Sequence, residues 1–262
     1  MFSNFVFSSS YSSFQSEEGE GVEAARMEKV NLEDADFSLV LLTQHFKDST
    51  ATPGLCLASY VKGYREVYKF LNLLGIVFGW VGSDVRAKIV QLEKYLAGEE
   101  KEHYQNIKAM INYEVEHDLI KTKKDDPSGS RTLLRLHRAL EYIIAFLHKL
   151  DDIQDADLCS VISVEAYEAT LMKYHPWVVQ VDINDYAELN ITNDSVTFQK
   201  AAKLAMKLLP TKGGLTLKVH PEGSEEGIKR TLENFPKAVS AMRAAYDAMH
   251  VHYEEKNLLD IP

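Results

Sequence analysis

Apolar residues recur at helical spacing along most of the chain, and no stretch alternates between apolar and polar residues as a surface strand would. The periodic segments are residues 37–48, 55–95, 101–120, 131–150, 155–177, 198–209 and 224–255. Runs of helices joined by short loops favour packed helical layers over an α/β fold. The pattern therefore predicts one all-α domain of seven or eight helices.

Glycine, proline and capping residues mark the breaks in these segments. The segment 55–95 contains Gly75, Gly79 and Gly82, and we expect them to bend or thin it because Gly costs about 1 kcal/mol in a helix. We expect Ser130 to cap the next arginine-rich helix and Pro236 to kink the last one. Residues 212–214 indicate only a turn.

Two parts of the chain lack helical periodicity. Residues 1–34 are rich in Ser and then acidic, and we expect a disordered tail there. Residues 182–197 contain four acidic residues and no Lys or Arg, which indicates an acidic loop or insert. Residues 35–262 are predicted to form the single domain.

The overall charge limits the partners that the chain can bind. The formal net charge of −10 argues against general nucleic-acid binding, which needs a basic face. Cys56 and Cys159 are the only cysteines, so no disulfide framework is implied. No apolar run reaches the roughly 18 residues of a transmembrane helix, and the N-terminus makes a poor signal peptide. We therefore expect a cytoplasmic protein.

The sequence contains no pattern that requires catalysis or a cofactor. His250 and His252 lie two residues apart and face different sides of a helix, and no Cys/His cluster has metal-ligand spacing. Neither a Gly-rich phosphate loop nor a nucleophile elbow is present. We predict no metal, no cofactor and no catalytic residue.

The helix predicted at residues 131–150 raises the main question about function. Arg131, Arg135 and Arg138 fall on one narrow stripe, although three cations near a helix start oppose the positive end of the macrodipole. One interpretation is a solvated basic face. However, the stripe continues into Tyr142 and Phe146, which suits an amphiphile whose anionic head is gripped by the planar Arg fork. The opposite side of the helix gathers Leu133, Leu136, Leu140, Ile143, Ile144 and Leu147.

Two further motifs contain candidate binding residues. Asp84 and Lys88 stand at i and i+4 in the favoured order for a helical ion pair. This is either an ordinary surface pair or a functional one, because it follows the nearly uncharged run 70–83. Taken alone, His175 reads as a core histidine held by the proline after it. Trp177 is either a packing residue or an anchor at a membrane surface.

Three stretches of the chain read LGIVFGWVGSDVRAKIVQLE, SGSRTLLRLHRAL and AYEATLMKYHPWVV. Together they resemble the glycolipid transfer protein superfamily, and the similarity is closest to its ceramide-1-phosphate transfer branch. The similarity extends from Phe37 to the end, where LLDIP also resembles that branch. It implies a two-layer helical sandwich of about eight helices that encloses a lipid pocket. It also implies that the protein transfers lipids between membranes without enzymatic chemistry.

The resemblance assigns roles to matching positions. Asp84 and His175 correspond to residues that bind the ceramide amide region, and Arg138 corresponds to a supporting basic position that braces Asp84 or the cluster. The phosphate-binding cluster corresponds to Lys88, Arg131 and Arg135. By resemblance and periodicity, the apolar pocket is expected to be lined by Phe70, Leu74, Phe78, Ile143, Phe146 and Leu147. Transient membrane docking is expected through Trp177, Trp80 and Val81.

The head group follows from two of these positions. In the glycolipid branch, Asn typically stands at the position of Lys88 and a sugar-stacking Trp at that of Arg135. A neutral sugar would leave the two cations here unpaired, whereas a phosphate satisfies them. We therefore expect a phosphate-headed sphingolipid, ceramide 1-phosphate above all, bound by a monomer. A choline on the phosphate is expected to be excluded or weakly bound.

Two departures from the branch bear on membrane contact. The 182–197 insert interrupts a segment that is usually helical, and Gln180 stands where the branch commonly has a basic residue.

Three alternatives for the function remain open at this point. They are a glycolipid or other sphingolipid sensor or transfer protein, a helical enzyme acting on an anionic metabolite, and a helical adaptor with a basic face.

Overall fold

The computed structural model describes residues 36–75, 78–120, 126–174, 202–203, 205–220 and 223–261, except the side chain of Trp80. Within these ranges the chain forms eight α-helices with described bounds, a further helical stretch at 202–203 and 205–206, two short 3-10 helices and no strand. The α-helices are α2 (Leu39–Thr50), α3 (Leu57–Leu73), α4 (Gly79–Ala97), α5 (Ile107–Glu116), α6 (Gly129–Asp152), α7 (Cys159–Ala169), α9 (Lys212–Val219) and α10 (Glu225–Glu255). The 3-10 helices are η2 (Lys101–Tyr104) and η3 (Met172–Tyr174).

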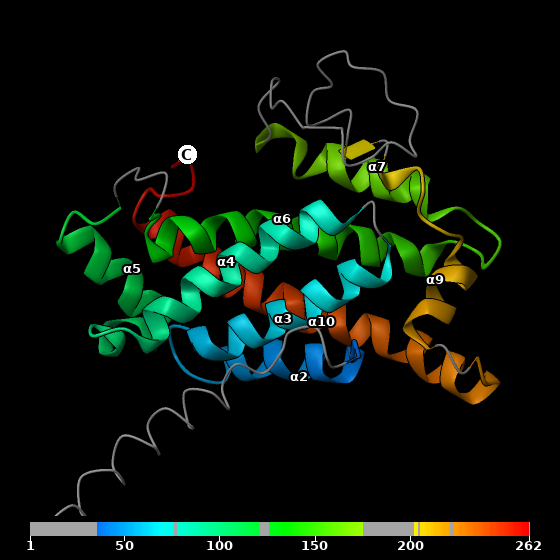
Figure 1. Cartoon of the computed structure of the whole chain (residues 1–262), viewed down its shortest axis with the longest axis horizontal. Helices are drawn as coiled ribbons and strands as arrows, with labels where there is room; N and C mark the ends of the chain where they lie inside the picture. Colours follow the sequence, from blue (N-terminus) through cyan, green and yellow to red (C-terminus); the bar gives the residue numbers. More distant parts are fainter. Residues whose placement is uncertain are drawn as a thin grey trace, which may run out of the picture. The chain divides into compact units, whose positions relative to one another are not determined.

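Five helices form a closed ring around the core. α2 packs against α3 and α10, α3 against α4, α4 against α6, and α6 against α10. Figure 1 shows α3 and α4 in front of α10 and α6, so the ring has two layers. α7 packs on α6, α5 on α6 and α10, and α9 on α10. The predicted two-layer, all-α fold is confirmed, and residues 37–262 form one compact unit.

The apolar side of α6 is the central packing surface. All six aliphatic residues that the pattern placed on that side are buried, as is Phe146. Full burial of a Leu or Ile side chain contributes roughly 1.5–3 kcal/mol. The arginine stripe on the opposite side therefore belongs to a helix that is packed against both layers.

The start of α6 differs from the prediction. Ser128, not Ser130, is the N-cap, and its Oγ accepts from the Arg131 N–H at 3.2 Å. The backbone N–H groups of Gly129 and Ser130 donate to the buried carboxylate of Glu114 on α5, at 2.7 and 2.8 Å. Because this carboxylate from another helix satisfies those two donors, the helix begins two residues earlier than predicted, at Gly129.

Two long periodic segments are interrupted. The segment 55–95 divides into α3 and α4, and Gly75 lies in the break with φ of +102°, a conformation that L side chains rarely adopt. The predicted helix 101–120 divides into η2 and α5, because the Asn106 side chain caps α5 by accepting from the Ala109 N–H at 3.1 Å. Hydrophobic spacing continues through both breaks and could not locate them.

The second half of the chain contains two further differences. In the segment predicted from residue 155, the helix begins only at Cys159. A turn precedes it, in which the Asp157 carboxylate accepts from the Gln154 N–H at 2.7 Å. The turn predicted at 212–214 is wrong, because α9 starts there with Thr211 as its N-cap. The predicted last helix is confirmed as α10, which contains Pro236.

The remaining predicted segments lie partly or wholly outside the described residues. The 1–34 tail and the 182–197 insert are wholly outside them. Of the predicted helix 198–209, residues 202–203 and 205–206 are described as helical. No helix in the described ranges is long and apolar enough to cross a membrane.

Candidate functional site

The register between α4 and α6 determines which of the predicted head-group residues stand at the same height on the two helices. The Gln91 Nε2 and the Tyr95 hydroxyl both donate to the Pro127 carbonyl, at 3.2 and 3.1 Å, just before α6 begins. The two helices run in opposite directions (Figure 1). One turn back along α4 and one turn forward along α6 therefore place Lys88 level with Arg131. A second turn places Asp84 level with Arg135.

Arg131 is a buried cation with unfilled donors. Only 8% of the residue is exposed, and its Nε and Nη1 have no hydrogen-bond partner among the described residues. Burial lowers the pKa of the Arg131 guanidinium, and the neighbouring Arg135 lowers it further. A buried donor without a partner costs about 1–3 kcal/mol, and more when it is charged. The side chain is therefore suited to bind an anion.

Lys88 and Asp84 form the ion pair that their spacing predicted. The Lys88 Nζ contacts the Asp84 Oδ1, and the two side chains are 14% and 66% exposed. The lysine stem is thus covered by protein, while the carboxylate stands at the surface. An ion pair with one solvated partner contributes about 0–1 kcal/mol, so stability alone gives little reason for this arrangement.

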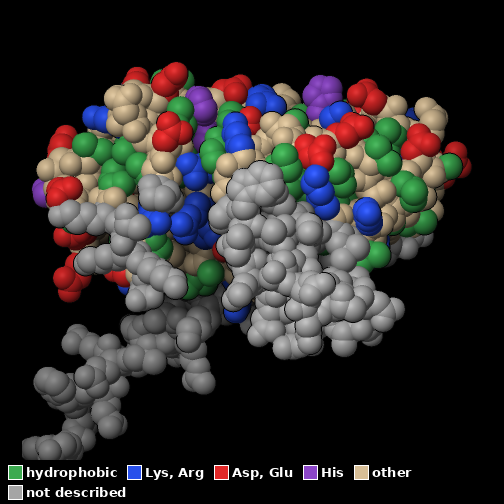
Figure 2. All heavy atoms as spheres, turned by 90° about the horizontal axis from the view of Figure 1, so that it is seen from above, with side chains coloured by type: hydrophobic (Ala, Val, Ile, Leu, Met, Phe, Trp, Pro, Cys, Tyr) green, Lys and Arg blue, Asp and Glu red, His purple; other side chains and the backbone are tan. Residues whose placement is uncertain are grey.

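Arg135 acts electrostatically on both of the other arginines of the stripe, Arg131 and Arg138. Its side chain is exposed, and its charge lowers the pKa of both Arg131 and Arg138. For Arg138, burial is the larger cause of the lowered pKa. Figure 2 shows Lys and Arg side chains gathered on one face of the molecule, seen from above relative to Figure 1. We call Lys88, Arg131 and Arg135 the cationic cluster.

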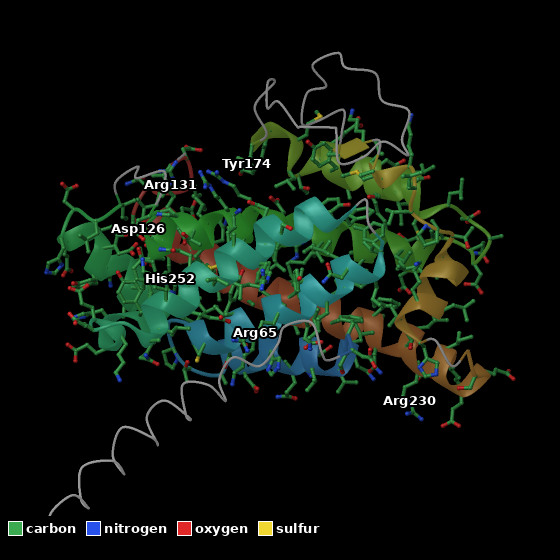
Figure 3. All side chains as sticks on the ribbon, in the orientation of Figure 1. Arg65, Asp126, Arg131, Tyr174, Arg230 and His252 are labelled. Carbon is green, nitrogen blue, oxygen red and sulfur yellow. The ribbon has the colours of Figure 1, made fainter. Side chains whose placement is uncertain are left out.

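Arg138 is tied to two segments that follow later in the chain. Its Nη2 donates to the carbonyls of Leu259 and Ile261, at 2.7 and 3.1 Å. Its guanidinium lies over the ring of Tyr174, 4.1 Å from the centroid. Figure 3 shows Arg131 and Tyr174 on the same side of the molecule, near the C-terminal segment. We expected Arg138 to brace Asp84 or the phosphate-binding cluster. The hydrogen bonds described for Arg138 go instead to the C-terminal end of the chain.

The predicted pocket residues lie in the interior. Five of the six are buried and Leu74 is half-buried. Phe70 contacts Phe37, with ring centroids 5.3 Å apart, and Phe146 lies 6.4 Å from Tyr142 on the same helix. The Tyr142 hydroxyl is hydrogen-bonded to the Ser163 Oγ at 2.7 Å. Along α6 the stripe thus changes from arginines to aromatic residues, as the pattern predicted.

Some predicted and unpredicted residues need separate mention. His175 and Trp177 lie outside the described residues, as does the side chain of Trp80, while Val81 is half-buried. Sequence reasoning missed Tyr174, although it directly precedes the His-Pro-Trp motif. It also missed Glu114, whose place at the start of α6 depends on packing between α5 and α6 and carries no local signal.

Fold and site together define an all-α protein of two helical layers with a cationic cluster on one face. The chain belongs to the glycolipid transfer protein family. The model of that family, described as glycolipid transfer protein (GLTP), matches residues 55–184. A ceramide-1-phosphate transfer protein from Xenopus laevis is 32% identical over 209 residues, which cover 79% of this chain and 86% of the relative. The protein of that name from Mus musculus is 30% identical over 239 residues, covering 87% and 98%.

Solved structures agree with the fold. The chain superposes on the apo form of mouse ceramide-1-phosphate transfer protein with a TM-score of 0.71 and 29% identity, covering 86% of this chain and 99% of the other. It superposes equally well, at 0.71, on the human protein in complex with 12:0 ceramide-1-phosphate. In that case the identity is 27%, and 87% of this chain and 100% of the other are covered.

Proposed function

We propose that this protein transfers a phosphate-headed sphingolipid, most specifically ceramide 1-phosphate, between membranes without enzymatic chemistry. Residues 35–262 act as the transfer domain of a monomer. The proposal places the protein in the cytoplasm, where it contacts membranes transiently. The relatives named above, and a homologous structure holding ceramide-1-phosphate, support the choice of lipid.

The observation that carries the proposal is the buried, unfilled guanidinium of Arg131. A phosphate monoester offers charge-assisted hydrogen bonds to its free Nε and Nη1, and Lys88 and Arg135 supply further positive charge. A neutral sugar would leave this cation buried without a counter-charge, which is unfavourable. The cationic cluster therefore favours ceramide 1-phosphate over a glycolipid.

The remaining polar roles follow the family motif. Asp84, two-thirds exposed beside Lys88, is proposed to accept from the ceramide amide and hydroxyl. His175 is proposed to bind the ceramide carbonyl. Both groups would read the backbone common to sphingolipids, while the cationic cluster reads the phosphate.

The hydrocarbon chains are proposed to supply most of the affinity. They would enter between the helical layers, among the buried residues Phe70, Phe78, Ile143, Phe146 and Leu147 and beside Leu74. Each CH₂ that leaves water gains about 0.8 kcal/mol, so two long chains outweigh the polar contacts. Trp177, Trp80 and Val81 are proposed to dock the protein on the membrane during uptake and release.

The test is lipid transfer between vesicles. We expect Lys88→Ala and Arg135→Ala to slow transfer of ceramide 1-phosphate at least about tenfold, the effect of losing one charge-assisted hydrogen bond. Lys149→Ala is the matched control, because Lys149 lies on α6 in an exposed 2.8 Å pair with Glu165. Wild-type rates in both cluster variants would show that the site is assigned wrongly.

A second variant separates binding from folding. Asp84→Asn removes a largely exposed carboxylate, so the melting temperature should change little. Binding of ceramide 1-phosphate should weaken, because the amide cannot accept as strongly as a carboxylate. Binding as tight as in the wild type would exclude Asp84 from the site.

The two competing functions predict different outcomes. An adaptor with a basic face could use the exposed Arg135, but it gives no reason for the buried Arg131. A helical enzyme would bind a soluble anionic metabolite, and such a compound should then raise the melting temperature more than a long-chain sphingolipid does. Retention of a sphingolipid through purification, detected by mass spectrometry, would favour transfer.

A further inference from the structure

We infer that Arg138 is a positioning residue that fixes the C-terminal segment Leu258–Ile261 beside the cationic cluster, and not a fourth ligand of the phosphate. This inference deepens the proposed function and depends on it. It assigns Leu258–Ile261 to the head-group site, through the contacts that this segment and Tyr174 make with Arg138 on α6.

The contacts of Arg138 point toward the C-terminal end. Its Nη2 donates to two backbone carbonyls, those of Leu259 at 2.7 Å and Ile261 at 3.1 Å. The carboxylate of Asp260 acts on the same guanidinium and raises its pKa, against the larger lowering effect of burial. The Nη2 of Arg138 is thus occupied by protein acceptors, which leaves the guanidinium fewer donors for a ligand, although its Nε has no partner among the described residues.

The same guanidinium holds a second segment. It lies 4.1 Å from the centroid of the Tyr174 ring, which ends η3. An Arg guanidinium above a Tyr ring is attracted by the negative face of the ring, and more strongly where water is excluded. Arg138 thus links α6, η3 and the C-terminal segment at one point, three residues along the helix from Arg135.

The C-terminal segment is also held by its own backbone. The Leu258 N–H donates to the Tyr253 carbonyl at 2.9 Å, and the Ile261 N–H donates to the Leu258 carbonyl at 3.3 Å. Tyr253, on α10, donates its hydroxyl to the Ser130 carbonyl at 2.7 Å, one residue before Arg131. The segment is therefore anchored beside the first and last arginines of the stripe, and we expect it to form one wall of the head-group site.

The experiment is a double-mutant cycle. Its variants are Arg138→Gln, a chain ending at Leu258, and the two changes combined; Arg230→Gln is the control, since Arg230 is exposed in a 2.9 Å pair with Glu226. The affinity for ceramide 1-phosphate in detergent-free vesicles and the melting temperature are measured for each. We expect each single change to weaken binding about tenfold, and the combination to weaken it no further, because both remove the same wall.

Several results would overturn the inference. If the losses in the combined variant multiply, Arg138 and the segment act independently, as they would if the guanidinium bound the phosphate through its Nε, which has no partner among the described residues. If the chain ending at Leu258 binds as tightly as the wild type, the segment is no part of the site. A fall in melting temperature without any loss of affinity would show a purely structural role.

Hydrogen exchange tests the anchoring without any lipid. In Arg138→Gln, the Ile261 amide should exchange at least about tenfold faster than in the wild type, while the control variant leaves it unchanged. Unchanged exchange would overturn the inference even if the truncated chain does not fold. If wild-type protein fails to bind ceramide 1-phosphate but Arg138→Gln releases the segment, then the proposed function fails and the anchoring stands.

Discussion

Replacing Arg131 by Met should stabilise the lipid-free protein and weaken lipid binding at the same time. Met keeps an unbranched apolar stem of similar length but removes the buried charge. In the free protein, the Nε and Nη1 of Arg131 have no partner among the described residues, and only 8% of the residue is exposed. The variant therefore removes an unfavourable feature of the empty site together with the group that we propose binds the phosphate.

The magnitude follows from those two donors. Each buried, unfilled donor costs about 1–3 kcal/mol, which sets an upper bound of roughly 6 kcal/mol. Residual contact with water and the imperfect fit of Met reduce the expected gain in the free energy of unfolding to about 1–3 kcal/mol. For a domain of this size that corresponds to a rise in melting temperature of roughly 2–12 °C.

Binding should change in the opposite direction. Loss of a hydrogen bond to a charged group costs about 1.5–3 kcal/mol, so the affinity for ceramide 1-phosphate should fall about 10- to 150-fold. The assay is thermal unfolding with and without the lipid, because ligand that binds the native state raises its melting temperature. The variant should start from a higher value and gain less from the lipid.

Arg135→Met is the matched control, because Arg135 belongs to the same cluster and is exposed. It should lose affinity without gaining stability. A fall in the melting temperature of lipid-free Arg131→Met by more than about 2 °C would refute the argument. That result would mean that the guanidinium is already satisfied in the empty protein.

Two further predictions concern groups outside the site. Burial, with help from neighbouring positive groups, lowers the pKa of His137 to about 3, below its unfolded value of 6.5, so the unfolded state binds more protons between these values. The contribution of His137 to stability should be complete above pH 6.5, and the free energy of unfolding should fall by about 1.4 kcal/mol per pH unit below it. Urea denaturation at pH 7 and 5 should show a smaller loss of this free energy for His137→Phe than for the wild type. An equal loss in both proteins would contradict the assignment. Glu114→Gln places an amide N–H against the N–H groups of Gly129 or Ser130, so it should lower the free energy of unfolding by about 1–3 kcal/mol. Glu116→Gln, exposed on the same helix, should change it by less than about 0.5 kcal/mol.

The helices could be predicted because amphipathic spacing is a property of the chain itself. The aliphatic side of α6 is buried as expected, and the i, i+4 pair of Asp84 and Lys88 forms. Boundaries were less predictable where a distant residue decides them. The sequence pointed to Ser130 as the cap of α6, whereas Ser128 caps it, and the carboxylate of Glu114 stabilises this earlier start by accepting from Gly129 and Ser130 N–H.

The site could be predicted as a set of residues but not as a set of environments. Spacing put Arg131, Arg135 and Arg138 on one stripe, yet it could not tell that the first is buried and the second exposed. That difference depends on which neighbouring helix covers each turn of α6. The contacts of Arg138 depend on the fold bringing Leu259 and Ile261 back to α6, which no local pattern encodes.

The carboxylate of Glu114 has a consequence for a protein that must release what it carries. It sits at the positive end of the α6 macrodipole, where it offsets a partial charge of roughly half a unit. Without Glu114, that partial positive charge would add to the charges of the three arginines. The free energy of the vacant protein would then rise further above that of the protein loaded with an anionic lipid. Glu114 on α5 thereby narrows the free-energy difference between the vacant and the loaded protein. A shuttle benefits from such reversibility, because excessive affinity would trap the lipid on the carrier.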